Sequence, residues 1–281
     1  KTETINFGAN TSGSCALIYI AQERGIELGR VQGSGPAGLI TERDVSAFLK
    51  EQGAPGGPSV QGPSFAYDVV PLTSVQRSTG RRLAEAAREI PYFDLEAEID
   101  VSAASRLWAS SAQDLSYTAI LLYATARALR DHPRLNAHFV NGELRCFRDI
   151  NIGVAIATDS GLLVPVIHQA DRREPLELQS ALTDLQSKAK VGRFAAADLS
   201  EATFTLSNLG MSGVDAFRAV PNPPEVAILA AGRVFERALV RQGQMVLRPA
   251  LRVTLSADHR ALDGATAAPF LVQLCEMLET L

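Results

Sequence analysis

The pattern of apolar and polar positions divides the chain into a short first part, a stretch with few large apolar side chains, and a long second part. The middle stretch, residues 51–64, reads EQGAPGGPSVQGPS and is rich in glycine and proline. Such a segment cannot bury enough apolar surface to fold, which predicts a linker. We therefore expect a small domain at residues 11–50, a linker at 51–70 and a larger domain at 71–281.

In the larger predicted domain, segments with helical composition alternate with segments of strand pattern. Four helices are expected, at residues 74–90, 116–133, 174–191 and 264–281. Strands are expected at residues 92–102, 202–210, 225–240 and 245–258, with two more about a turn within 151–167. This mixture predicts a layered α/β fold with a largely buried sheet.

The small first part predicts two short helices around a loop rich in glycine and proline. Residues 16–25 form the first helix in this prediction, and residues 43–49 form the second, with Thr41 as its N-cap. Asp44 lies in the first turn of the second helix, where its carboxylate could accept hydrogen bonds from N–H groups of residues 33–38. A unit of this size has a weak core, which favours a binding module held together by loop hydrogen bonds.

Composition narrows the function classes. The 281 residues are 46% hydrophobic and 21% charged, as in an ordinary globular protein. A net charge of −4 without a block of Lys and Arg argues against nucleic acid as the main partner. The scattered cysteines Cys15, Cys146 and Cys275 suggest a reducing, cytoplasmic compartment. The sequence lacks a signal-peptide core and any apolar run of membrane-spanning length, so no membrane partner is expected.

One of the four histidines, His259, stands in the stretch SADHRALDG at residues 256–264. It follows a strand pattern and precedes a predicted helix, a position where reacting groups are often presented. A neutral imidazole of pKa near ~6.5 is well matched to take a proton from a thiol of pKa around ~8.5. His259 is therefore a candidate catalytic base.

Two interpretations of this stretch stay open on its residues alone. In the first, Asp263 is the candidate carboxylate that shapes the histidine site, Asp258 is the other, and Gly264 lets the backbone turn tightly. In the second, His259 simply ends a strand and Asp263 caps the last helix.

A second polar stretch, FTLSNLGMSG at residues 204–213, places Ser207 and Asn208 at the end of an apolar strand. A serine hydroxyl in such a place could donate a hydrogen bond to a developing oxyanion. Ser, Asn and Gly are also common turn residues, so an ordinary strand end and turn is the alternative.

Together, several stretches resemble the catalytic domain of dihydrolipoyl acyltransferases, the E2 cores of 2-oxo acid dehydrogenase complexes. They are TLSADHRALDG, FTLSNLGMSG, NPPEVAIL, NIGVAIATDSGLLVPVI and LSYTAILLYATARALRDHPRLNA, in family order from about residue 71 to the C-terminus. The segment ERGIELGRVQGSGPAGLITERDVSAFL resembles the family's peripheral subunit-binding domain. The resemblance implies a chloramphenicol acetyltransferase-like two-layer domain with a mixed sheet, preceded by a small two-helix binding domain.

The resemblance also implies a reaction and its residues. An acyl group would move between a dihydrolipoyl thioester and the thiol of coenzyme A. His259 would be the general base, Ser207 of a neighbouring subunit would hydrogen-bond the oxyanion, and Asp263 would support the histidine site. The chain would form a homotrimer or a multiple of three. No segment of this sequence matches a lipoyl domain, so we expect the lipoyl group on another domain or chain.

The chain departs from the family pattern in its binding module and near the histidine. The first helix reads GSCALIYIA where basic residues are usual, Leu39 stands where arginine is typical, and Tyr92 stands where histidine is common. Apolar side chains cannot form charge-assisted contacts, which argues against binding of the usual E1 or E3 subunits through residues 11–50.

These departures leave two alternative functions open. One is an E2-like acyltransferase of a specialised pathway that loads an acyl group onto an acyl carrier protein. The other is a non-catalytic scaffold subunit, which would not be expected to keep His259, Asp263 and Ser207 together.

Overall fold

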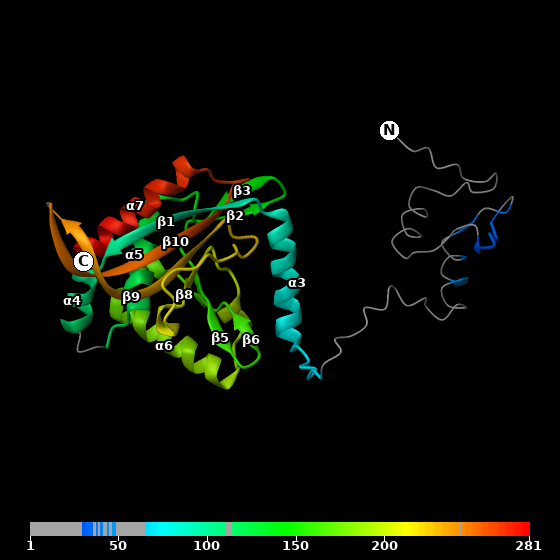
Figure 1. Ribbon diagram of the computed structural model, residues 1–281, viewed down its shortest axis with the longest axis horizontal. Coiled ribbons are helices and arrows are strands. Elements are labelled where there is room, and N and C mark those ends of the chain that lie inside the picture. Colours follow the sequence, from blue (N-terminus) through cyan, green and yellow to red (C-terminus); the bar gives the residue numbers. More distant parts are fainter. Residues whose placement is uncertain are drawn as a thin grey trace. The chain divides into compact units, whose positions relative to one another are not determined.

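A computed structural model describes residues 30–35, 38, 40–41, 44, 47–48, 66–110, 114–241 and 243–281 (Figure 1). The chain divides into two compact units, residues 1–70 and 71–281, and each is described by itself. The predicted first helix of the small unit, the stretch 51–64 and Leu39 lie outside the described residues. No helix in the described part of the chain is long and apolar enough to cross a membrane.

Asp44 organises the described part of the small unit. Its carboxylate accepts hydrogen bonds from the backbone N–H groups of Ser34, at 2.9 Å, and Thr41, at 2.8 Å, and from both hydroxyl groups. These bonds hold the pKa of the Asp44 carboxyl far below its usual range, with the Ser34 hydroxyl as the largest cause. The prediction that Asp44 binds the preceding loop is confirmed, and the Thr41 hydroxyl also donates to Asp44.

The larger unit is built on a six-stranded mixed sheet, as the sequence predicts. Its strand order is β1 (Tyr92–Asp100), β10 (Gln244–Asp258), β9 (Ala227–Arg241), β8 (Phe204–Asn208), β4 (Ile152–Val154) and β7 (Val166–Ile167). β8 runs parallel to both β9 and β4, and the other neighbouring strands are antiparallel.

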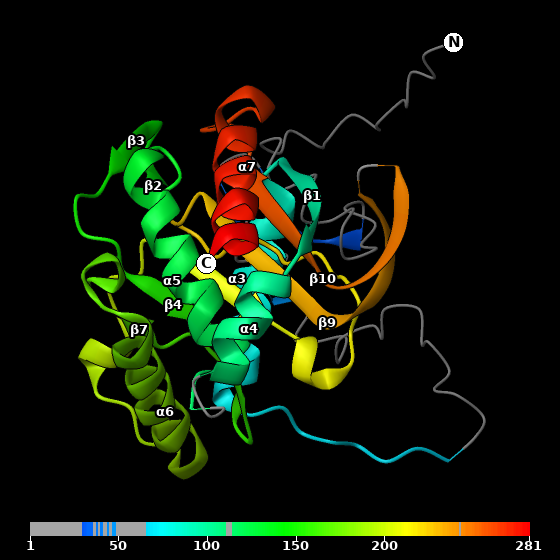
Figure 2. The same cartoon turned by 90° about the vertical axis from the view of Figure 1, so that its left-hand side faces the viewer.

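Helices cover one face of this sheet and bury its apolar side chains. The helices nearest the sheet are α4 (Ser102–Ser110), α5 (Tyr117–Asp131) and α7 (Gly264–Thr280), and α6 (Pro175–Val191) packs on α5 (Figure 2). Leu206, Leu229 and Leu255 lie side by side in the strand register and are fully buried in this core. Because strand side chains alternate between faces, this register sends the intervening residues to the opposite face.

The opposite face of the sheet is polar and still largely buried. Thr205, Thr254 and Ser256 on this face are at most 2% exposed. Residues 214–218 lie over it, and the Val214 carbonyl accepts a hydrogen bond from the Arg233 N–H at 2.7 Å. Gly232 permits this close approach, since a Cβ there would stand 2.0 Å from the Asp215 carbonyl oxygen.

The predicted helices and long strands are confirmed within a few residues, but the segment 151–167 differs from its prediction. It forms four short strands: β4, β5 (Ile156–Thr158), β6 (Gly161–Leu163) and β7. β4 and β7 belong to the large sheet, whereas β5 and β6 pair only with each other. The chain leaves the large sheet at Ala155, whose N–H bonds the Leu206 carbonyl.

Apart from short 3-10 helices, the elements without a sequence prediction are α4, β2 (Ala137–Val140) and β3 (Glu143–Cys146). The helix α3 (Ser74–Glu89) was expected, and it begins with a capping box. In it Thr73 accepts a hydrogen bond from the Gln76 N–H at 3.1 Å, and the Gln76 side chain accepts one from the Thr73 N–H at 2.8 Å. Such reciprocal bonds satisfy backbone donors that a helix N-terminus leaves free.

Candidate active site

His259 lies in the turn that follows β10, at the end of the sheet where β1 begins. Its backbone N–H donates to the Pro91 carbonyl at 3.0 Å. Its exposed imidazole packs against the Phe93 ring, with ring centroids 4.8 Å apart and planes tilted by 56°. The prediction that a strand end presents His259 is confirmed.

Asp258 and Arg260 hold this turn on both sides of the histidine. Asp258 is 1% exposed, and its carboxylate binds the Arg260 guanidinium through bonds of 2.7 and 3.0 Å and also accepts from the Arg260 backbone N–H. The guanidinium in turn lies over the Phe139 ring, 4.8 Å from its centroid. The Asp258 carboxylate is thus occupied by Arg260, so the interpretation that it orients His259 is not supported.

Asp263 is the N-cap of α7. Its carboxylate accepts from the backbone N–H of Thr266 at 2.8 Å and from the Thr266 hydroxyl at 2.7 Å. The pKa of the Asp263 carboxyl is lowered, chiefly by the Thr266 hydroxyl, with the charge of His259 among the smaller causes. The capping interpretation is therefore confirmed, and a supporting role toward His259 stays a prediction. Gly264 makes no tight turn: it has an ordinary φ and open space where a Cβ would stand.

Ser207 lies near the end of β8 on the polar face of the sheet. Its hydroxyl makes no hydrogen bond within the described part of the chain. The neighbouring Asn208 is fully engaged, since it donates to the Thr118 hydroxyl at 3.0 Å and accepts from the Gly210 N–H at 2.8 Å. Gly210 passes so close to β9 that a Cβ would stand 2.6 Å from the Gly232 carbonyl oxygen. The strand therefore ends in a fixed turn, beside which the Ser207 hydroxyl is left available.

Within one chain the sheet register holds Ser207 far from His259. Ser207 pairs with Ala230 of β9, and Ala230 pairs with Thr254 of β10. His259 follows Thr254 by five residues, so the two sites are separated by roughly 15 Å along the strands and about 10 Å across two strand spacings. A hydrogen bond spans only about 3 Å, so the two side chains of one chain cannot act on the same small group.

Glu225 is a buried acid between these two regions, and the sequence reasoning above did not single it out. It is 3% exposed; its carboxylate accepts from the Thr205 hydroxyl at 2.5 Å and from the Asn222 side-chain amide at 2.8 Å. Burial raises the pKa of Glu225 to about 7, while these bonds and the charge of Arg82 act in the opposite direction. An acid directly before the apolar run VAILAA was the signal for it in the sequence.

The other histidines have structural contacts, as expected. His132 bonds the Gln273 side chain, and His138 and His168 bond the carbonyl oxygens of Ala202 and Ala197. Among the described residues no group of three potential metal ligands lies close together.

Comparison with known proteins identifies the class. Residues 65–281 match the model of the 2-oxoacid dehydrogenase acyltransferase catalytic domain, and residues 19–46 match that of the E3 binding domain. The chain therefore belongs to the 2-oxoacid dehydrogenase acyltransferase family and is an enzyme of the E2 type.

Two curated relatives illustrate the range of the family. The chain is 34% identical over 285 residues to the lipoamide acyltransferase component of the branched-chain alpha-keto acid dehydrogenase complex of Pseudomonas aeruginosa, covering 97% of this chain and 67% of that one. It is 31% identical to the dihydrolipoyllysine-residue acetyltransferase component of the pyruvate dehydrogenase complex of Staphylococcus aureus, covering 95% and 69%. The chain thus spans about two thirds of the length of these relatives.

Solved structures agree on the fold. The Azotobacter vinelandii dihydrolipoamide acetyltransferase superposes with a TM-score of 0.76 at 29% identity, covering 80% of this chain and 96% of that one. A probable dihydrolipoamide acetyltransferase of Listeria monocytogenes gives 0.74 at 28% identity, covering 76% and 95%. In the Azotobacter enzyme a serine, a histidine and an asparagine have been studied for their roles in the catalytic mechanism. The histidine follows the serine by 52 positions and precedes the asparagine by four, the spacing of Ser207, His259 and Asp263.

Proposed function

We propose that this enzyme transfers an acyl group between a dihydrolipoyl thioester and the thiol of coenzyme A, as the E2 core of a 2-oxo acid dehydrogenase-type complex. The observation that carries the proposal is the placement of a candidate base and a candidate oxyanion donor at strand ends of the sheet, at the sequence spacing found in the Azotobacter enzyme. His259 stands exposed in a turn fixed by an ion pair, and Ser207 at a strand end has a hydroxyl that bonds no residue the structure describes. The Azotobacter enzyme has a histidine and a serine at the same spacing.

In the proposed reaction the side chains act in sequence. The neutral imidazole of His259 takes the proton of the coenzyme A thiol, and the sulfur attacks the thioester carbonyl carbon. The carbonyl oxygen becomes an oxyanion, which the Ser207 hydroxyl stabilises by a hydrogen bond. The carbonyl then re-forms as the bond to the dihydrolipoyl sulfur breaks, and the leaving sulfur takes the proton back from the imidazolium. Each sulfur exchanges one proton and one acyl bond, so no further reactant is needed.

We further propose that each active site combines His259 of one copy with Ser207 of another. The separation of the two residues within one chain supports this, because a single copy cannot bring both to one thioester. A closed ring of identical interfaces would give every His259 a partner Ser207, and a homotrimer or a multiple of three is the proposed form.

An apolar ribbon supports association of copies. β1 ends opposite Ala250 of β10. The preceding residues of β10, 244–249, pair only with residues 236–241 of β9, so the two strands extend past β1 as a hairpin (Figure 1). Val240, Met245 and Leu247 lie on one face of this hairpin and are 72%, 78% and 68% exposed. Three neighbouring apolar side chains with such exposure are typical of an interaction surface.

The lipoyl group is proposed to come from another domain or chain, because no lipoyl domain was recognised in this sequence. Binding of an E3-type subunit is proposed for the segment 19–46, because its match to the E3 binding domain outweighs the doubt raised by its missing basic residues. A reducing, cytoplasmic location also remains a proposal, and the described cysteines Cys146 and Cys275 are free thiols.

Intact-mass spectrometry of the transfer reaction tests this function. S-acetyldihydrolipoamide and a branched-acyl analogue would be offered separately, each with coenzyme A and a phosphopantetheinylated carrier protein in competition. Acyl-coenzyme A is expected as the product, and its formation should depend on His259, with His168→Ala as the matched control. Acylated carrier protein as the main product would replace the proposed acceptor, and no acyl transfer from either donor would refute catalysis.

A further inference from the structure

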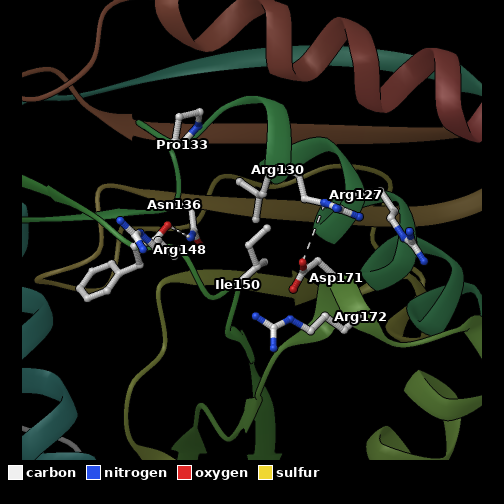
Figure 3. A pocket seen from close by; sticks show the side chains of 10 residues that line it. Arg127, Arg130, Pro133, Asn136, Arg148, Ile150, Asp171 and Arg172 are labelled. Atoms are coloured by element: carbon white, nitrogen blue, oxygen red, sulfur yellow. Dashed lines mark hydrogen bonds and ion pairs between the residues drawn. The ribbon is translucent and has the colours of Figure 1, made fainter.

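A hollow of about 570 Å³ lies at the C-terminal end of α5, and neither His259 nor Ser207 lines it (Figure 3). Its polar walls come from three segments: α5 contributes Arg127 and Arg130, the loop after β3 contributes Arg148, and the short helix η3 (Ala170–Arg172) contributes Asp171 and Arg172. Leu129, Pro133, Phe147 and Ile150 supply apolar surface between them. The volume is in the range typical of small-molecule sites.

The hollow carries an excess of positive charge, with four guanidinium groups and one carboxylate on its walls. Arg127 and Arg172 pair with Glu174 and Asp149, at 3.1 and 3.0 Å. Arg148 has no ion pair or hydrogen bond with any residue that the structure describes. An unpaired arginine in a concave wall is suited to bind a phosphate or carboxylate through two parallel hydrogen bonds.

Two buried polar atoms of the same walls lack hydrogen-bond partners. They are the Nε of Arg127 and the Oδ1 of Asp171. The Asp171 side chain is only 13% exposed, and its Oδ2 stands 4.0 Å from the Arg130 Nε, beyond hydrogen-bond distance. Protein atoms cover both of these atoms, so a ligand in the hollow would reach the other Asp171 oxygen, Oδ2, which makes no hydrogen bond with a described residue.

Both requirements together define the ligand chemistry. The unpaired guanidinium of Arg148 favours an anion, and the Asp171 carboxylate favours a hydrogen-bond donor close to that anion. Figure 3 shows Asp171 between Arg130 and Arg172, with Arg148 on the other side of Ile150. We propose that this hollow binds a small organic phosphate whose phosphate contacts Arg148 and Arg172 and whose hydroxyl or amino group donates to Asp171. The site is separate from the proposed acyl-transfer site.

Calorimetric titration of the full chain tests the proposal with three probes. ATP and glucose 6-phosphate carry phosphate with nearby hydroxyl groups, whereas inorganic pyrophosphate carries the negative charge alone. At least one organic phosphate is expected to bind saturably, at one site per chain, and more tightly than pyrophosphate. Which of the two binds more tightly distinguishes a nucleotide from a sugar phosphate as the natural class.

Two variants locate the binding. Arg148→Gln removes the unpaired charge from an exposed side chain and should weaken organic-phosphate binding roughly 10-fold or more, because a charge-assisted pair is lost. The matched control is Arg193→Gln, which removes an exposed arginine at the end of α6 outside the hollow. Both variants should keep the acyl-transfer rate of the unmodified chain.

Asp171→Asn separates the two parts of the proposed contact. Loss of the negative charge should strengthen pyrophosphate binding while the organic phosphate loses its bond to the carboxylate, so the ratio of the two affinities should fall. An unchanged ratio would refute the role of Asp171. No saturable binding of any probe up to millimolar concentration, or equal binding by Arg148→Gln and the unmodified chain, would overturn the site.

Discussion

The turn around His259 and the strand end around Ser207 are built in opposite ways. The His259 turn is fixed by its own chain: the Asp258–Arg260 ion pair flanks it, a backbone bond to Pro91 anchors it, and Asp263 begins the next helix. The Ser207 strand end has a hydrogen-bonded backbone, but its hydroxyl bonds nothing in the described part of the chain. The surroundings of the proposed base are thus complete within one chain, whereas the proposed oxyanion donor has room for a group from outside.

This difference teaches how a shared site can be stable before it is assembled. Arg260 neutralises the only charge buried in the His259 turn, so the turn does not need a neighbouring copy to compensate it. A serine hydroxyl is uncharged and half-exposed, so leaving it free costs little until a substrate arrives.

Replacing the base should have the largest effect. His259→Ala should lower the acyl-transfer rate by roughly 10³-fold or more, because general-base catalysis contributes on that scale. The side chain is exposed, so the fold and the assembly should persist. Steady-state kinetics with sedimentation velocity on the same sample measures both, and a nearly normal rate would remove His259 from the mechanism.

Removing the proposed oxyanion donor should have the next largest effect. Ser207→Ala should lower kcat by about 10²-fold, as loss of one such donor does in other enzymes, with little change in KM. The hydroxyl makes no bond within the described residues, so stability should be unaffected. A raised KM with an unchanged kcat would assign Ser207 to substrate binding.

Mixing the two variants tests whether the two regions meet between copies. Each variant alone should keep about a hundredth or less of the unmodified activity, but an interface between the two can combine an intact His259 with an intact Ser207. In a randomly mixed ring about a quarter of the interfaces would do so, which predicts recovery of about a quarter of the unmodified activity after co-expression. Activity no higher than that of the separate variants would mean that each site lies within one chain.

Glu225 connects the two regions, and its titration should change stability with pH. Its carboxylate bonds Thr205 on the Ser207 strand, and the carbonyl of the next residue, Val226, accepts from the Asp258 N–H. The folded-state pKa of about 7 lies above the ordinary value of 4.5, so the folded chain holds a proton that the unfolded chain releases. This contribution is complete below pH 4.5 and is lost as pH rises through 7, which should lower the free energy of unfolding by roughly 2 kcal/mol between pH 5 and 7.5.

Urea unfolding at several pH values measures this contribution. The variant Glu225→Gln should flatten the pH dependence in this range, and the exposed Glu85→Gln serves as the matched control. If Glu225→Gln keeps the same fall in the free energy of unfolding with pH as Glu85→Gln, a group other than Glu225 causes that fall.

Asp263 should give the smallest effect. Asp263→Ala removes the N-cap bond to Thr266, which should lower Tm by a few degrees and change kcat much less than Ser207→Ala. Asp263→Asn keeps a capping oxygen and should restore Tm. A fall in kcat with Asp263→Asn at unchanged Tm would instead give this residue a role toward His259.

Features that depend on neighbours in the chain were predictable from the sequence. The turn after β10 was located because a strand pattern, His259 and a helix pattern follow one another within a few residues. Asp44 was placed on its loop by the same local reasoning, and the structure confirms its bonds to Ser34 and Thr41. In contrast, the segment 151–167 was wrongly predicted as two strands, because nothing local shows that the chain leaves one sheet for another at Ala155.

Residue type and spacing along the chain were enough to give the order of the elements, the family and the candidate residues His259, Ser207 and Asp263. The spatial relation between these residues follows only from the folded chain. The pairing of Ser207 with Ala230 and of Ala230 with Thr254 sets the separation from His259, and the fold around Glu225 buries its carboxylate. Such relations depend on strand register and on packing between distant segments, where a shift of one residue would reverse every side chain on the sheet.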